Sequence, residues 1–230
     1  MLEENKDKSI REDYHEIIFE PITHSYLVGG KVLPSVSEIM KPLSTEYYKD
    51  IPEAIMNGAA SRGKRVHEAI EIYDLFGVET ESKEIKPYLL AYKMARQLEH
   101  FTPIANEKML TNGEFCGTLD IIATLGDELV IVDLKATSQI NFDLLEVQLA
   151  AYRELSRANG FEINKTYVCH LKPNSYKFVE IIPNDYLWQQ LKNEWIVNVG
   201  KHMNKYQEAF DKQFAEPLEM LKKLGVKKWN

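Results

Sequence analysis

The sequence GTLDIIATLGDELVIVDLKATS, residues 117–138, decides the fold. It contains two apolar, partly β-branched runs separated by Gly-Asp at 126–127, which is a favourable two-residue turn between antiparallel strands. Away from Asp120, Asp133 and Lys135 both faces of this hairpin are apolar, as in a central strand pair covered on both sides. The stretch therefore predicts a buried hairpin that carries charged side chains within the sheet.

The register of the hairpin brings two carboxylates together. A turn centred at 126–127 pairs Asp120 with Asp133, and cross-strand partners have Cβ atoms about 4.5–5.5 Å apart. Lys135 shares their face because it lies two residues after Asp133. Opposed buried carboxylates repel each other and resist ionisation. Three arrangements are open: the acids share a proton, Lys135 neutralises them in a structural ion pair, or they bind a divalent cation. For such a cation, oxygen ligands favour Mg²⁺ or Mn²⁺ over zinc.

Composition narrows the class of protein. The 230 residues suit one large domain, and 35 acidic against 28 basic residues give a net charge of −7. That balance argues against a generic basic nucleic-acid coat protein, but it allows an enzyme that grips nucleic acid in one local groove. The two cysteines are too few for a four-cysteine cluster. We expect a cytoplasmic protein without membrane association, because no apolar run could span a bilayer and the charged N-terminus has no signal-peptide core.

The remaining pattern predicts an α/β layered domain with a mixed central sheet. A capping box formed by Ser35 and Glu38 predicts a helix from about residue 36, and Gly77 is expected to end a second one. Helices are expected at 53–76, 83–100 and 141–160, and from about 184 to the C-terminus with a break near Pro217. Strands are expected at 17–20, 24–28, 103–110, 114–125, 128–136, 165–172 and 176–183.

Two helices add polar candidates to the hairpin. Gln148 and Tyr152 are four residues apart and therefore neighbours on one helix face. His67 lies on an apolar stripe of the 53–76 helix, where a lone histidine is often a buried, hydrogen-bonded side chain. Arg62 and Arg65 belong to a local basic cluster that suits either phosphate groups or a solvated helix face.

Taken in order, these segments resemble a known family. The segments that carry the resemblance are GKRVHEAIE (63–71), GTLD (117–120), VDLKA (132–136) and VQLAAYRE (147–154). The set resembles the PD-(D/E)XK nuclease superfamily, and within it the RecB-like branch. The N-terminal HSYLVGGKVLPSVSEIM (24–40) is similar to the lead-in of small phage-type and mitochondrial-maintenance-type exonucleases of this superfamily.

The resemblance implies a restriction-endonuclease-like αβββαβ core with a mixed central sheet, an N-terminal hairpin and C-terminal helices. One nuclease domain over 1–230 would comprise N-terminal strands and helix (1–52), a catalytic core (53–182) and a helical extension (183–230). The implied activity is hydrolysis of DNA phosphodiester bonds with one or two Mg²⁺ or Mn²⁺ ions. It would be an exonuclease acting on ends or single strands in replication, recombination or repair, where other proteins would be its partners.

The resemblance also assigns roles to residues. Asp120, Asp133, His67 and the Leu134 carbonyl would hold the metal, and Lys135 would act on the attacking water. Further assignments are Glu107 as an additional acid of the site and Gln148, Tyr152, Arg62 and Arg65 as DNA contacts.

Two features limit this picture. The cysteines of iron–sulfur relatives are absent, and the chain has no P-loop motif, so we expect neither an iron–sulfur cluster nor a nucleotide cofactor.

The alternatives to a DNA nuclease are a catalytically silent module that binds DNA or protein, and a metal-dependent hydrolase of RNA or a cyclic nucleotide.

Overall fold

The computed structural model describes residues 17–20 and 25–198. The chain divides into two compact units, Met1–Gln189 and Gln190–Asn230. In the second unit, the described residues 190–198 are helical. The predicted helix break near Pro217 lies outside the described residues, and the assignment of residues 1–230 to one nuclease domain stays a prediction.

A five-stranded mixed sheet forms the centre of the first unit. Its strands are β4 (Phe101–Thr111), β5 (Cys116–Leu125), β6 (Glu128–Lys135), β7 (Ile163–Lys172) and β8 (Ser175–Ile181), in the order β4-β5-β6-β7-β8. Only β6 and β7 run parallel, because α5 connects them; the other neighbours are antiparallel. The predicted mixed central sheet is confirmed.

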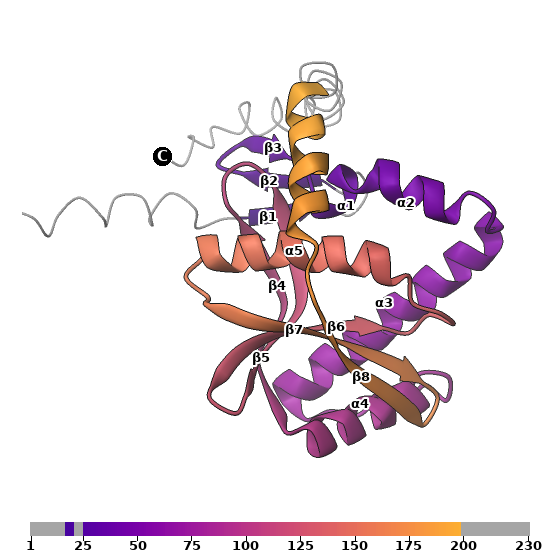
Figure 1. Cartoon of the computed structure of the whole chain (residues 1–230). Helices are drawn as coiled ribbons and strands as arrows, with labels where there is room; N and C mark the ends of the chain where they lie inside the picture. Colours follow the sequence, from indigo (N-terminus) through magenta and orange to yellow (C-terminus); the bar gives the residue numbers. More distant parts are fainter. Residues whose placement is uncertain (1–16, 21–24, 199–230) are drawn as a thin grey trace, which may run out of the picture. The chain divides into compact units, whose positions relative to one another are not determined.

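Helices cover both faces of this sheet (Figure 1). They are α3 (Glu53–Phe76), α4 (Lys86–Glu99) and α5 (Phe142–Ala158). Figure 1 shows α5 on one side of the sheet and α3 and α4 on the other. Apolar residues of α3 and α4, such as Ile70 and Leu89, form one buried cluster with Ile121 and Val132 of the hairpin. Burial of this kind stabilises by about 25 cal/mol for each Å² of apolar surface, so this cluster anchors the hairpin against α3 and α4.

Local signals fix the helix ends as the sequence indicates. Gly77 has φ +68° and its N–H donates to the Tyr73 carbonyl, which ends α3 at the predicted residue. This left-handed conformation costs glycine little because it lacks a Cβ. The Asn141 side chain accepts from the Leu144 N–H at 3.1 Å and starts α5. These caps set where the side chains of α3 and α5 meet the sheet.

A smaller antiparallel sheet precedes the core. It contains β1 (Ile17–Glu20), β2 (Ser25–Val28) and β3 (Lys31–Leu33), followed by α1 (Val36–Ile39) and α2 (Lys41–Tyr48). The predicted capping box at the start of α1 is confirmed, with Ser35 and Glu38 bonded reciprocally. The strand β3 and the helix α2 are additions to the predicted elements. Tyr26 of β2 bonds Thr118 of β5 through their hydroxyls at 2.8 Å, which ties the small sheet to the hairpin.

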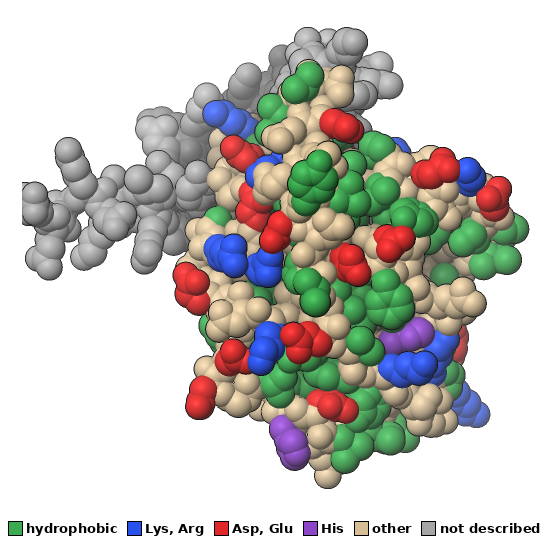
Figure 2. Space-filling model, viewed as in Figure 1, with side chains coloured by type: hydrophobic (Ala, Val, Ile, Leu, Met, Phe, Trp, Pro, Cys, Tyr) green, Lys and Arg blue, Asp and Glu red, His purple; other side chains and the backbone are tan. Residues whose placement is uncertain are grey.

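The surface of the described chain mixes side-chain types. On the face in Figure 2, apolar, acidic and basic side chains are interspersed. None of the described helices has the combination of length and apolarity that crossing a bilayer requires.

Candidate metal centre

The hairpin has the predicted register up to the functional residues. Leu125 pairs with Glu128 and Ile121 with Val132. The ladder then stops one pair before Asp120 and Asp133, so these acids are not ladder partners as predicted.

The Asp120 carboxylate takes the place of the next ladder bond and accepts from the Leu134 N–H at 2.7 Å. The alternation of β5 is also interrupted here. Ile121 belongs to the cluster formed with α3 and α4, whereas Gly117 lies against Tyr152 of α5. Strict alternation would put both residues on one face. Asp120 thus leaves the regular strand and turns its side chain toward β6.

Three side chains from separate elements converge on one point. His67 Nδ1 of α3 lies 3.1 Å from Glu107 Oε1 and 3.5 Å from Asp120 Oδ1. The three ligand-type atoms lie within 4.8 Å of one another. Glu107 adopts φ +45°, a conformation that is uncommon for a residue with a side chain. Its neighbours pair as Asn106 with Ile121 and Lys108 with Leu119, so this kink lies opposite Asp120.

His67 also contacts the backbone of β6. Its Nε2 donates to the Leu134 carbonyl at 3.1 Å. Burial lowers the pKa of His67, but the Asp120 carboxylate and the bond to Glu107 outweigh this effect and raise the pKa to about 9. Both ring nitrogens face oxygen acceptors, Glu107 at Nδ1 and the Leu134 carbonyl at Nε2. The protonated ring is therefore a cation beside the Glu107 and Asp120 carboxylates. A metal ion bound at this ring would compete with one of its protons.

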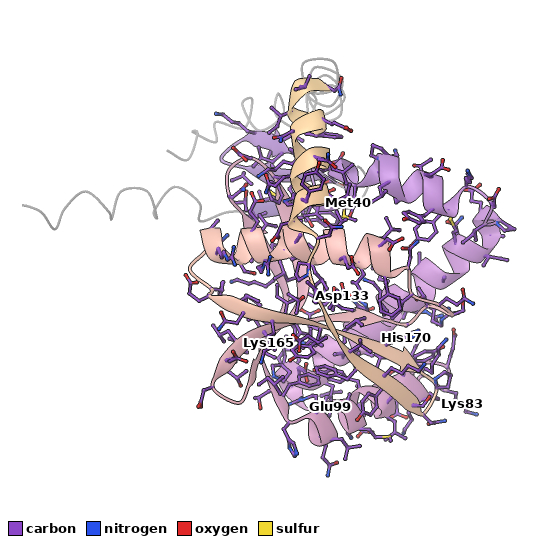
Figure 3. The ribbon with its side chains drawn as sticks, in the orientation of Figure 1. Met40, Lys83, Glu99, Asp133, Lys165 and His170 are labelled. Atoms are coloured by element: carbon purple, nitrogen blue, oxygen red, sulfur yellow. The ribbon has the colours of Figure 1, made fainter. Side chains whose placement is uncertain are left out.

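Asp133 is the most buried acid of the site. The residue is 1% exposed, and Figure 3 shows it in the interior next to α5. Lys135 Nζ forms an ion pair with Asp133 Oδ2 at 2.7 Å, whereas Oδ1 has no hydrogen-bond partner among the described residues. Burial raises the pKa of Asp133 and the Lys135 charge offsets this only in part. Buried carboxylate oxygens without hydrogen bonds are costly.

Lys135 links the hairpin to α5. It donates to Gln148 Oε1 at 3.3 Å, and Gln148 Nε2 donates to the Tyr152 hydroxyl at 3.2 Å. Burial raises the pKa of Tyr152 well above its ordinary value, so this hydroxyl stays protonated. The predicted neighbours on α5 therefore lie in a chain of contacts that begins at Asp133.

Gly117 explains how α5 comes so close. A Cβ on Gly117 would lie 2.8 Å from Tyr152 Cε1 and 3.1 Å from Leu155 Cδ1. A real side chain never tolerates the first distance without movement of its neighbours. The glycine of GTLD thus supplies space, which the sequence pattern alone did not indicate.

The two predicted arginine contacts differ in their surroundings. Arg62 Nε donates to the Ala136 carbonyl at 3.3 Å, directly after Lys135 in the chain. Arg65 instead forms two hydrogen bonds with the exposed Glu84, at 3.0 and 2.8 Å. A phosphate would have to replace that ion pair to bind Arg65.

The charge of the site favours a cation. Glu107, Asp120 and Asp133 contribute three carboxylates against Lys135 and the titratable His67. The carboxylates fit a hard divalent ion such as Mg²⁺ or Mn²⁺, and the close approach of His67, Glu107 and Asp120, with ligand-type atoms within 4.8 Å of one another, is the observation that favours one. The trio that could hold a metal ion contains His67, Glu107 and Asp120; Asp133 lies outside it, and its role as a ligand stays a prediction, as does that of the Leu134 carbonyl.

The structure brings Glu107 together with His67 and Asp120, and its role in the site stays a prediction. Its position depends on an irregular stretch of β4, where the register with β5 shifts between Pro103 and Ala105. Pro103 lacks the N–H of a regular ladder and is the one signal in the sequence for that irregularity.

Comparison with solved structures gives distant similarities. Neither a protein-family profile nor a curated protein sequence matches the chain. A phage-related exonuclease from Haemophilus somnus 129PT is 13% identical with a TM-score of 0.41, over 80% of this chain and 97% of that one. The protein SSO0001 is 13% identical with a TM-score of 0.39, over 74% of this chain and 77% of that one. With TM-scores below 0.5, neither similarity supports an assignment of function.

Proposed function

We propose that this chain is a metal-dependent nuclease that hydrolyses phosphodiester bonds of DNA, as an exonuclease acting on ends or single strands. The observation that carries the proposal is the combination of a surplus of carboxylates with a lysine held among them. Asp133 is 1% exposed and Lys135 Nζ lies 2.7 Å from its Oδ2, while His67, Glu107 and Asp120 form the group that could hold a metal ion. The four segments that resemble PD-(D/E)XK nucleases contain these residues in order.

The metal would be held by Asp120, Glu107 and His67, with Asp133 and the Leu134 carbonyl as further oxygen donors. A divalent cation supplies Lewis-acid polarisation of the scissile phosphate and of the attacking water. The hydrogen bond from the Leu134 N–H fixes one oxygen of Asp120 at 2.7 Å, so the carboxylate is oriented before a ligand arrives. Ligands held in this way lose little conformational entropy on binding.

Lys135 would act on the water and on the phosphate. Burial lowers the pKa of this ammonium, but the Asp133 and Asp120 carboxylates more than compensate and raise it. Lys135 therefore carries a positive charge, which stabilises the negative charge that grows on the phosphate oxygens. Asp133 and Gln148 hold its Nζ from two sides, which aims the charge at one place in the site.

Gln148 and Tyr152 would position the substrate strand. The Gln148 amide bridges Lys135 and Tyr152, so the substrate side of α5 and the reacting lysine are coupled. Tyr152 is 7% exposed, which limits it to an edge or hydroxyl contact and excludes broad stacking of a base on its ring in this conformation.

A cleavage assay with labelled ends tests the proposal. Linear single- and double-stranded DNA labelled at the 5′ or the 3′ end, internally labelled circular DNA, and an end-labelled RNA of matching sequence are incubated with Mg²⁺, with Mn²⁺ or with EDTA. We expect metal-dependent release of short labelled products from linear DNA and no cleavage of circles or in EDTA. Cleavage of circular DNA would mean that the chain is an endonuclease and not an exonuclease. Cleavage of a matching RNA alone would change the substrate, and no cleavage of any of them would refute the proposal.

A further inference from the structure

A strip of basic side chains surrounds the loop that leaves the metal centre. Residues 136–141 connect β6 to α5, and three successive carbonyls of this loop are hydrogen-bonded by side chains from α3 and β7. Arg62 bonds Ala136 at 3.3 Å and His170 Nε2 bonds Thr137 at 2.8 Å. Lys172 bonds Ser138. We call Arg62, His170 and Lys172 the basic strip.

The position of the strip follows from the parallel pairing of β6 and β7. Lys135 is the register partner of His170, so the strip begins beside the reacting lysine. Lys172 follows at the C-terminal end of β7. Figure 3 shows His170 at one end of β7 and Lys165 at the other, and Figure 2 shows a histidine next to basic side chains over the same end of the sheet.

Carboxylates of the described residues do not neutralise the two permanently charged members of the strip, Arg62 and Lys172. Within the described ranges, neither Arg62 nor Lys172 forms an ion pair with a carboxylate; both side chains donate to backbone carbonyls. Many other cations of the first unit have an acidic partner, such as Arg65 with Glu84 and Lys93 with Glu79. A chain with a net charge of −7 therefore keeps positive charge at this edge.

We propose that the basic strip binds phosphate groups of the substrate strand on one side of the scissile bond. This inference rests on the proposed nuclease function and deepens it, because it gives the direction in which the strand leaves the centre: over residues 136–138, toward the end of β7. The strip side chains are half-buried and keep N–H groups beyond those spent on the carbonyls, since a guanidinium has five donors and an ammonium three. Non-esterified phosphate oxygens accept such bonds without a sequence requirement.

Salt dependence of binding tests this proposal separately from catalysis. Each phosphate contact on a single strand contributes roughly −0.7 to the slope of log K against log salt concentration. Fluorescence anisotropy of a 5′-fluorescein-labelled oligothymidylate is measured in EDTA, where cleavage is not needed, between about 50 and 200 mM KCl. We expect Arg62→Gln and Lys172→Gln each to make the slope shallower by roughly 0.7, and Lys172→Arg to retain the original slope.

The matched control is Lys165→Gln. Lys165 lies on the same strand, seven residues before Lys172 and thus about 23 Å away, and pairs with Glu128 at 2.7 Å. The Lys165→Gln variant should show the same slope of log K against log salt concentration as the unmodified chain.

Two results would overturn the proposal. One is binding that weakens equally at every salt concentration with an unchanged slope, since that indicates only a brace for the loop. The other is no binding by the unmodified chain at any salt concentration. If the unmodified chain cleaves DNA but the slopes are unchanged in the strip variants, the proposed role of the strip is refuted and the nuclease proposal stands. If the slopes change in the strip variants but the unmodified chain does not cleave DNA, the strip binds phosphate groups and the proposed nuclease activity is refuted.

Discussion

Replacement of Gly117 by alanine tests how closely α5 must approach the hairpin. The new Cβ would lie 2.8 Å from Tyr152 Cε1, and 3.1 Å from both Leu155 Cδ1 and Val36 Cγ2. All three neighbours are buried, with exposed fractions of 7%, 0% and 2%. No open space is available on this side, so the ring or the helix must move.

The expected cost can be worked from these distances. Overpacking of a close-packed core costs about 1–3 kcal/mol, and the loss of glycine entropy in the unfolded chain returns about 0.4–1 kcal/mol. The net loss of about 1–2 kcal/mol lowers the melting temperature by roughly 2–8 °C for a unit of this size. A shift of Tyr152 by a few tenths of an ångström also breaks its 3.2 Å bond to Gln148. We expect kcat to fall roughly tenfold.

The assay combines thermal unfolding with cleavage of end-labelled DNA. The control is Gly58→Ala on α3, where a Cβ meets no atom within 4 Å and alanine favours the helix by about 1 kcal/mol. Its melting temperature should stay equal or rise, with cleavage unchanged. A Gly117→Ala protein with the melting temperature and kcat of the unmodified chain would refute the close-packing argument.

The other predictions concern two residues of the site and the bond that ties the small sheet to the hairpin. Lys135→Ala should lower kcat by roughly 10²–10³-fold while oligonucleotide binding in EDTA persists; equal turnover, with Lys165→Ala as the control for charge, would exclude the assigned role. Gln148→Ala should lower kcat about tenfold, because Lys135 loses one of the groups that hold it, and unchanged kinetics would remove that coupling. Tyr26→Phe should cost about 1 kcal/mol in unfolding free energy through the lost bond to Thr118, which urea denaturation measures; no loss would mean that this bond adds no net stability.

The sequence predicted those parts of the fold that depend on local chemistry. The Gly-Asp turn at 126–127 fixed the hairpin register, and the capping box at Ser35 and the glycine at position 77 marked helix ends correctly. Hydrophobic periodicity gave the order of elements around the sheet, because each period is set by the geometry of one helix or strand. These features need no knowledge of distant contacts.

The parts that were not predicted depend on contacts between distant segments. Asp120 leaves the ladder because its carboxylate accepts a hydrogen bond from the Leu134 N–H. The alternation of apolar and polar residues in β5 cannot reveal that a side-chain oxygen takes the place of a backbone acceptor. Glu107 reaches His67 through a kink opposite Asp120, which a regular strand would not produce. Lys172 gains its place from the parallel pairing of β6 and β7, a relation that no local pattern encodes.

Anomalous diffraction from crystals soaked in Mn²⁺ tests the central claim most directly. The claim is that the surplus of carboxylates on the hairpin serves a divalent cation and not a structural ion pair with Lys135. We predict a strong anomalous peak bounded by His67, Glu107 and Asp120, and its loss in Asp120→Ala crystals soaked in the same way. No peak at this position, with Lys135 still paired to Asp133 at saturating Mn²⁺, would contradict the claim.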